Sequence, residues 1–177
     1  SNYCIINNIE EEHLNYYKTK ENLINSFKKV LKNVITNNGY ISINKDDKNI
    51  SSVIKEIQYN NIHSYSITDN PKGICAKNII YKQNYTIFDL YDHNKLVDTI
   101  KLNTLGTHNI YNALASISLC LNMGISLNSI KKGLLNFKGV KRRLQLIYKN
   151  KDLKVFDDYA HHPTEIKTTL NGLSNAY

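Results

Sequence analysis

Short apolar runs alternate with segments of helical period in the first part of the sequence, and this alternation restricts the possible folds most strongly. Residues 19–38 carry apolar side chains at helical spacing, with Thr19 positioned as N-cap and Gly39 as the stop signal. A shorter helix is predicted at 50–57, and strands flank these helices at residues 3–10, 39–44 and 63–68. This order is typical of a parallel sheet with crossover helices, so we predict an α/β fold.

The pattern changes to strand-like alternation over residues 77–102. Turn-forming residues divide this stretch at 83–84 and 92–94, and it has no helical period, which predicts a β-meander appended to the sheet. Two helices are predicted next, over 107–124 and 126–139. The expected architecture is therefore a mostly parallel sheet with an antiparallel extension and a helical pair.

The basic stretch KGVKRRLQ, residues 138–145, is the strongest candidate for a domain boundary. Beyond it, residues 152–160 predict a strand, and Pro163 is well placed at the first position of a helix. We therefore divide the chain into a first domain at residues 1–139 and a linker with the start of a second domain at residues 140–177.

The composition indicates a globular protein with a basic surface. The chain has 23 Lys and Arg against 15 Asp and Glu, a net charge of +8, and such charge can supply salt-dependent contacts to nucleic acid. The lysines are scattered, however, and no dense basic arm or RNP-type aromatic signature is present, so we expect no nucleic acid partner. No apolar run approaches the roughly 20 residues of a membrane span. The three separated cysteines suggest a reducing, cytoplasmic location.

The stretch GTHNIYN, residues 106–112, contains the first candidate site. Asn109 and Asn112 are three positions apart at the start of a helix and therefore share one face, with His108 at the same end. Amide groups provide the paired donors and acceptors that suit a purine edge, and a helix start favours anions. Asn near a helix start is also a common cap, so this stretch alone leaves both interpretations open.

Two arginines and an aspartate form the second candidate site. Arg142 and Arg143 lie in the connector, where a guanidinium can reach a phosphate, although exposed surface charge explains them equally well. Asp158 falls at the carboxyl end of a predicted strand, where open α/β sheets place their ligands, and it could accept hydrogen bonds from a ribose. The alternative is a polar turn that caps the helix beginning at Pro163.

The histidines give weaker indications of metal binding. His161 and His162 point in different directions from an extended chain, which makes a poor chelate. The stretch NNIEEEHLNYY resembles a metal loop more closely, because acidic residues precede His13. Magnesium prefers oxygen ligands, so His13 would need carboxylates from elsewhere.

Four motifs occur in an order and spacing that resemble the Mur ligase family of peptidoglycan synthesis: NIEEEHLNYY, GTHNIYNALASISL, FKGVKRRLQ and DDYAHHPTEI. The resemblance covers nearly the whole chain, and the last two motifs are the most specific. It implies part of the ATP-binding central domain, followed by the start of a Rossmann-like α/β C-terminal domain.

The resemblance also implies a role for each matching position. His13 matches a histidine that helps to hold Mg²⁺, and Asn109 and Asn112 match the pair at the adenine of ATP. Arg143 matches the arginine directed at the ATP phosphates, where it would assist catalysis. Asp158 matches the aspartate at the ribose.

Three neighbouring positions match the same motifs. His108 and Arg142 match the nucleotide-binding motifs, and His161 matches a position near the reacting groups. The chain departs from the usual family pattern at Glu12, where the family has Asp, and at Asn7, where it has Thr. The first departure keeps the charge and lengthens the side chain.

The implied reaction is ATP-dependent amide formation through an acyl phosphate. The substrates would be UDP-N-acetylmuramate and L-alanine, because Tyr159 and Glu165 favour the members that add L-alanine over those that reattach a recycled tripeptide. The tripeptide reaction remains the alternative, since the GVKRRL connector suits both.

No Gly-x-x-Gly-Lys-Ser/Thr phosphate loop occurs in the sequence, which also begins without Met. We therefore expect the chain to be part of a longer protein and to have no ligase activity alone. A basic nucleic-acid-binding module and a non-catalytic nucleotide-binding scaffold remain alternatives from a different functional class.

Overall fold

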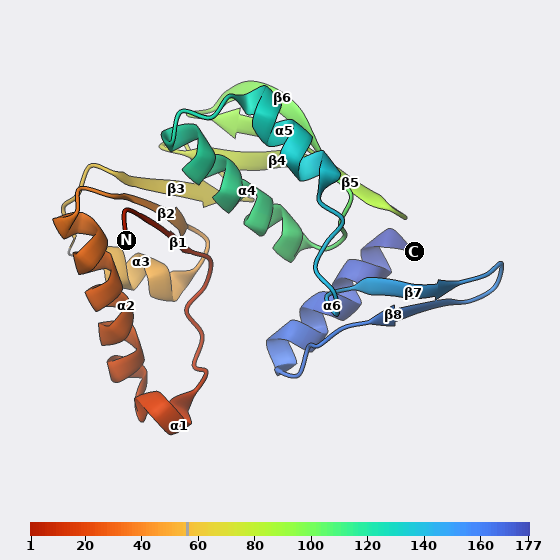
Figure 1. Cartoon of the computed structure of the whole chain (residues 1–177), viewed down its shortest axis with the longest axis horizontal. Helices are drawn as coiled ribbons and strands as arrows, with labels where there is room; N and C mark the ends of the chain where they lie inside the picture. The colour runs from red at the N-terminus through yellow and green to blue at the C-terminus, as the bar shows by residue number, and fades with distance from the viewer. Residues whose placement is uncertain (56) are drawn as a thin grey trace.

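The computed structural model describes residues 1–55 and 57–177, and its main feature is a six-stranded sheet (Figure 1). The strands lie side by side in chain order: β1 (Tyr3–Ile6), β2 (Tyr40–Asn44), β3 (Ile62–Ser66), β4 (Ile74–Lys82), β5 (Tyr85–Asp92) and β6 (Lys95–Leu102). Strands β1 to β4 pair in parallel, whereas β4, β5 and β6 form an antiparallel meander.

Helices pack on both faces of this sheet: α2 (Lys20–Thr36) and α3 (Lys48–Ile54) on one, and α4 (Thr107–Asn122) and α5 (Leu127–Asn136) on the other. The pleat of β2 and β3 explains why the buried side chains divide between the two faces of the sheet. Ile41 and Ile43 point to the first face and join the core formed with α2 and α3. Asn44 pairs in register with Tyr65, so Tyr65 points to the opposite face and packs with α4.

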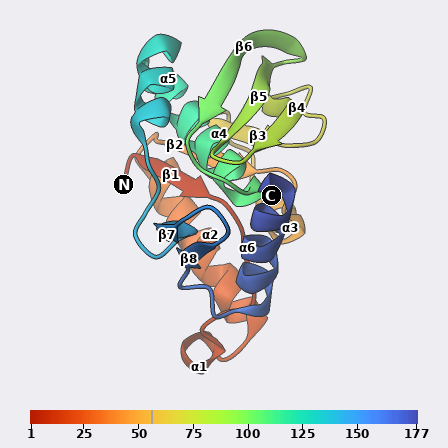
Figure 2. The same cartoon turned by 90° about the vertical axis from the view of Figure 1, so that its right-hand side faces the viewer.

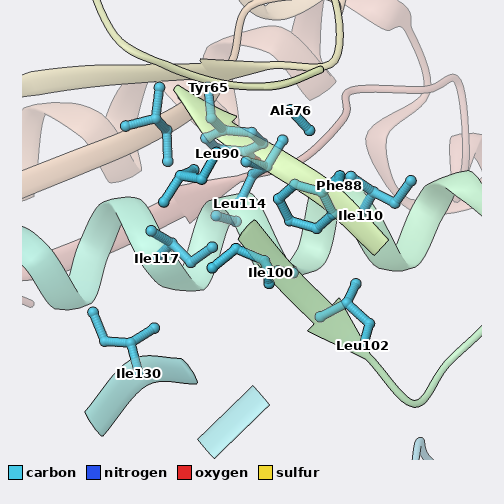
Figure 3. Packing of buried hydrophobic residues seen from close by; sticks show 13 residues of the cluster. Tyr65, Ala76, Phe88, Leu90, Ile100, Leu102, Ile110, Leu114, Ile117 and Ile130 are labelled. Atoms are coloured by element: carbon cyan, nitrogen blue, oxygen red, sulfur yellow. The ribbon is translucent and has the colours of Figure 1, made fainter. Parts of the chain in front are cut away.

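Helix α4 is fixed in rotation by its buried stripe. Ile110, Leu114 and Ile117 are fully buried at helical spacing and pack against Phe88 and Leu90 of the meander (Figure 3). Because these positions face the core, the opposite side of the first turn of α4 faces the loop that follows β1. This arrangement places the candidate asparagines at a cavity.

Asp46, just beyond the end of β2, connects the end of β3 to α4. Its carboxylate accepts hydrogen bonds from Ser66 Oγ at 2.7 Å, Ile67 N at 2.9 Å, Thr68 Oγ1 at 2.8 Å and Tyr111 OH at 2.9 Å. Burial alone would raise the pKa of Asp46, but these hydrogen bonds outweigh it and hold the pKa below its ordinary value. One ionised side chain thus joins the ends of β2 and β3 to α4.

Asp46→Asn is expected to lower the free energy of unfolding by about 1 kcal/mol at pH 7, because an amide cannot accept all four hydrogen bonds. A depressed carboxyl pKa contributes stability above the unfolded-state value near 4, and this contribution is lost as pH falls through the folded-state value. Urea unfolding should therefore show wild type losing more stability than the variant below about pH 4. Asp152→Asn, on the exposed β7–β8 turn, is the control, and equal stability of all three proteins would contradict the prediction.

The C-terminal part forms a small unit of its own (Figure 1), and Figure 2 shows the same elements after a 90° turn. It contains an antiparallel hairpin of β7 (Gln145–Lys149) and β8 (Lys154–Asp157), and helix α6 (Pro163–Ala176). Pro163 occupies the start of α6, where His162 accepts a hydrogen bond and Glu165 bonds back to the cap in a capping box. The residue that follows α6 contacts the turn between β4 and β5, since Tyr177 OH donates to Gln83 O at 2.8 Å.

The α/β class, the mostly parallel sheet and the appended meander are confirmed. Thr19 caps α2 as predicted. The helix predicted at 50–57 ends earlier, at Ile54, and Glu56 lies outside the described residues. The sequence predicts neither the short α1 (Leu14–Tyr17) nor β7. Strand β7 is largely exposed and owes its conformation to pairing with β8, a contact that local pattern does not encode.

Within the described part of the chain, every helix is too short or too polar to cross a membrane.

Candidate functional site

A cavity of about 870 Å³ opens between the loop after β1, the start of α4, the end of α5 and helix α6. Five of the predicted site residues line it: His108, Asn109, Asn112, Arg143 and Asp158. Its apolar lining includes Leu102, Leu134, Phe137 and Val140. This size and this mixture of apolar wall and convergent polar groups are typical of small-molecule sites.

The first turn of α4 orients Asn109. Gly106 begins the helix at φ 89°, a conformation that glycine adopts without strain, and the His108 ring packs against it. Asn109 Nδ2 donates to Leu105 O at 2.7 Å and lies 3.1 Å from His108 Nε2. Because Nδ2 faces these two acceptors, Asn109 offers its Oδ1 to a ligand.

His108 acts in this turn as a neutral side chain. Burial lowers its pKa, and Arg143 lowers it further, against an opposing effect of Asp158. His108 Nδ1 is buried and has no hydrogen-bond partner among the described residues. A neutral imidazole that accepts from Asn109 through Nε2 agrees with the lowered pKa and carries its proton on Nδ1, so His108 orients the amide rather than supplying a positive charge.

Asn112 lies one turn further along the same face. Its Oδ1 accepts a hydrogen bond from Asn7 Nδ2 at 2.9 Å, across the gap between β1 and α4. The amide nitrogen of Asn112 is therefore the group available to a ligand. Asn109 and Asn112 together present one acceptor and one donor to the cavity.

Arg143 is oriented by a carboxylate at the start of α6. Its Nη1 lies 3.3 Å from Glu165 Oε1, and Glu165 Oε2 accepts from the amides of His161 at 3.1 Å and His162 at 3.4 Å. The His161 amide is the largest of the effects that lower the pKa of Glu165, and Arg143 adds to it. An ionised Glu165 thus holds the guanidinium at the cavity wall.

Asp158 joins the connector, β8 and α6. Its Oδ2 accepts from Leu144 N at 2.8 Å and from Thr169 Oγ1 at 3.2 Å, and its Oδ1 accepts from Ala160 N at 2.7 Å. Leu144 and Arg142 adopt positive φ values of 47° and 59°, which non-glycine residues adopt only when their surroundings impose it. Asp158 therefore fixes the connector conformation as well as lining the cavity.

Three predicted site residues lie outside this cavity lining. The Arg142 guanidinium lies 4.7 Å from the Tyr159 ring centre, with Nε 3.7 Å from Asp157 Oδ2. The His161 ring lies edge-on to the Tyr159 ring, with the ring centroids 5.2 Å apart, and the His161 side chain is 72% exposed. His13 occupies the N-cap of α1 in a left-handed conformation.

Whether the site can hold a metal ion depends on the His, Cys, Asp and Glu side chains that lie close together. No group of three or more His, Cys, Asp or Glu side chains within residues 1–55 and 57–177 is arranged to hold a metal ion. The residues that the structure describes therefore do not form a complete metal cage by themselves. Glu10 and Glu12 do line the cavity, and Mg²⁺ is commonly held by one or two carboxylates together with substrate phosphates.

Some residues of the site were not predicted from sequence. Thr164, Thr168 and Thr169 line the cavity from one face of α6. Their spacing from Pro163 is the signal that could have identified them, because it places all three on the side that also carries Glu165. Asn7 gave no local signal, since its contact with Asn112 is between residues far apart in the sequence.

Comparison with known proteins identifies the family. Residues 1–120 match the family described as Mur ligase middle domain, and residues 142–177 match the family described as Mur ligase, glutamate ligase domain. The chain belongs to the Mur ligase family. This assignment agrees with the resemblance carried by the four motifs.

Relatives of this Mur ligase chain are longer than the chain itself. It is 39% identical to a UDP-N-acetylmuramate–L-alanine ligase of Pelagibacter ubique, with 99% of the chain and 38% of the relative covered. A ligase of the same name from Clostridium kluyveri is 42% identical, with coverage of 97% and 37%. The chain thus spans less than two fifths of the length of these curated relatives.

Solved structures show the same Mur ligase fold. A UDP-N-acetylmuramate-alanine ligase of Thermotoga maritima superposes with a TM-score of 0.83 at 24% identity, covering 99% of this chain and 39% of that protein. A MurF ligase of the same organism, solved in complex with ADP, superposes with a TM-score of 0.80 at 20% identity, covering 98% and 39%.

Proposed function

We propose that the full-length protein is an ATP-dependent UDP-N-acetylmuramate:L-alanine ligase of cell-wall synthesis, acting in the cytoplasm. The observation that carries this proposal is the convergence of five motif residues on one cavity between the two parts of the chain. The relatives named as L-alanine ligases support this substrate over the tripeptide. The chain at residues 1–139 would supply part of the central domain and residues 140–177 the start of the C-terminal domain.

In this proposal the cavity holds the nucleotide. Asn109 Oδ1 and Asn112 Nδ2 bind the adenine edge, which needs an acceptor and a donor side by side. Asp158 lies near the ribose, and Arg143 approaches the phosphates with its charge and planar donors. His108 orients the adenine-binding amide, whereas Arg142 supports the connector.

The chemistry requires charge neutralisation. A carboxylate oxygen of UDP-N-acetylmuramate bonds to the γ-phosphorus and ADP leaves. The L-alanine amine then attacks the acyl carbon, so that phosphate leaves and the amine loses a proton. Arg143 would stabilise the transferring phosphoryl group, and His161 would act near the reacting groups. Mg²⁺, held with help from His13 and carboxylates outside this chain, would supply further positive charge when bound.

Phosphate release by the full-length protein with Mg-ATP and UDP-N-acetylmuramate tests the proposal. Release is expected to require L-alanine, and Asn109→Ala should raise the KM for ATP about tenfold, because a polar contact to the adenine is lost. Asn122→Ala, at the far end of α4, is the control. Release with L-Ala-γ-D-Glu-diamino acid tripeptide in place of L-alanine would assign the recycling reaction instead. No release with either amine would refute the ligase assignment.

A further inference from the structure

Asn112 is held by a relay of side chains that begins in the core. The hydroxyl of Tyr65, a fully buried residue of β3, donates to Asn7 Oδ1 and has Ile6 O as a second acceptor at 3.2 Å. Asn7 Nδ2 in turn donates to Asn112 Oδ1 at 2.9 Å. The backbone of Asn7 is fixed as well, because its carbonyl accepts from Asn44 Nδ2 at 2.9 Å. The relay runs from the core, past the end of β1, to the cavity wall.

Tyr65 is the first member of the relay, and its hydroxyl orients the amide groups of the next two members. A tyrosine hydroxyl has one hydrogen to donate, and burial raises the pKa of Tyr65, which keeps that hydrogen in place. In the structure the oxygen of the Asn7 amide faces the Tyr65 hydroxyl, and this turns Asn7 Nδ2 toward Asn112. The oxygen of Asn112 then accepts the hydrogen bond from Asn7, and its amide nitrogen faces the cavity.

We propose that Asn7 and Tyr65 are positioning residues that fix the amide of Asn112 with its nitrogen toward the cavity, where it donates to N7 of adenine. The inference rests on the proposed ATP site. Asn109 presents an acceptor and Asn112 a donor, which complements the N6 amine and the N7 acceptor of adenine. Guanine shares the N7 acceptor, so the Asn112 contact reports on N7, and an analogue that lacks N7 tests it directly.

The substitution Asn7→Asp keeps almost the same side-chain shape but reverses the direction of the hydrogen bond between residue 7 and Asn112. The carboxylate has acceptors only, so it receives hydrogen bonds from both Tyr65 and Asn112, and Asn112 must turn its oxygen toward the cavity. Isothermal titration of the full-length protein with ATP and with 7-deaza-ATP, which lacks the N7 acceptor, measures the effect. Wild type should bind ATP about tenfold more tightly than the analogue, whereas the variant should bind ATP about tenfold more weakly and no longer discriminate.

Tyr65→Phe is the second variant, because it removes the donor that sets the polarity and leaves the ring in the core. Its discrimination between ATP and 7-deaza-ATP is expected to lie between those of wild type and Asn7→Asp. Tyr59→Phe removes a similar hydroxyl bond, to Gly39 O, far from the cavity and is the matched control. Asn61→Asp, beside Tyr59, controls for the added charge. Both controls should keep the wild-type ratio.

The possible results separate this inference from the function on which it rests. Failure of wild type to bind ATP would refute the proposed function, and the inference with it. If wild type binds ATP without discriminating against 7-deaza-ATP, or if both folded variants keep the wild-type ratio, the ATP site stands and the positioning role is wrong. Thermal unfolding identifies any variant that fails to fold, and if Asn7→Asp does so, Tyr65→Phe decides the question.

Discussion

Arg143→Ala is expected to slow phosphate release by the full-length protein on the order of a thousandfold at saturating ATP, with a smaller effect on ATP binding. Arg143 is the predicted phosphate-directed arginine, and its guanidinium lies on the cavity wall, oriented by Glu165. Phosphoryl transfer depends mainly on positioning and on neutralising the charge that develops on the transferring group. Removal of the guanidinium should therefore act on the rate constant more than on the KM, which steady-state kinetics can separate.

Neighbouring basic residues provide the controls for Arg143. Lys141→Ala removes an exposed charge from the same connector and should leave the rate near the wild-type value. Arg142→Ala is expected to cost about tenfold or less, because its guanidinium packs on Tyr159 outside the cavity lining. Arg143→Lys should recover only part of the lost rate, since a point charge lacks the planar pair of donors. Equal losses in Arg142→Ala and Arg143→Ala would contradict the assignment of the phosphate contact to Arg143.

The sequence predicted the elements that local periodicity and capping determine. Helix α2 begins at its Thr19 cap, and α5 begins at Ser126, whose hydroxyl accepts from Ser129 N. His108, Asn109 and Asn112 meet at one cavity because they share the first turns of one helix. These features depend on residues within four positions of each other, where spacing translates directly into geometry.

The remaining features depend on contacts between distant residues. The role of Asn7 required knowing that β1 ends beside α4 and that Tyr65 lies buried behind it. Asp158 matched a ribose-binding position, yet the structure also shows it holding Leu144 and Thr169, an arrangement that no local pattern reports. The role of each residue in nucleotide binding remains a prediction.

Helix α6 crosses the start of α4 so closely that glycine occupies both sides of the contact. A Cβ atom on Gly172 would lie 3.1 Å from Gly106 Cα and 3.4 Å from Leu144 Cδ1. The same helix carries Thr168 and Thr169 on the cavity wall. The spacing between the two helices therefore sets the width of the proposed nucleotide site.

Gly172→Val is expected to weaken ATP binding by the full-length protein about a hundredfold, because its methyl groups push α6 away from α4. A shift of about 1 Å separates the Asp158 side of the cavity from the Asn109 side, and misplacement of this size is enough for such a loss. Overpacking should also lower the free energy of unfolding, by about 1–3 kcal/mol. Isothermal titration with ATP and urea unfolding measure the two effects.

Gly133→Val is the matched control, because Gly133 lies in α5 and a Cβ added there meets no atom within 4 Å among the described residues. Valine is a better helix former than glycine, so both substitutions gain a few tenths of a kcal/mol in helix propensity. The two variants differ only in what the new side chain contacts. ATP affinity should therefore remain unchanged in Gly133→Val and fall in Gly172→Val. If ATP binds equally to both, the contact between α6 and α4 does not set the geometry of the site.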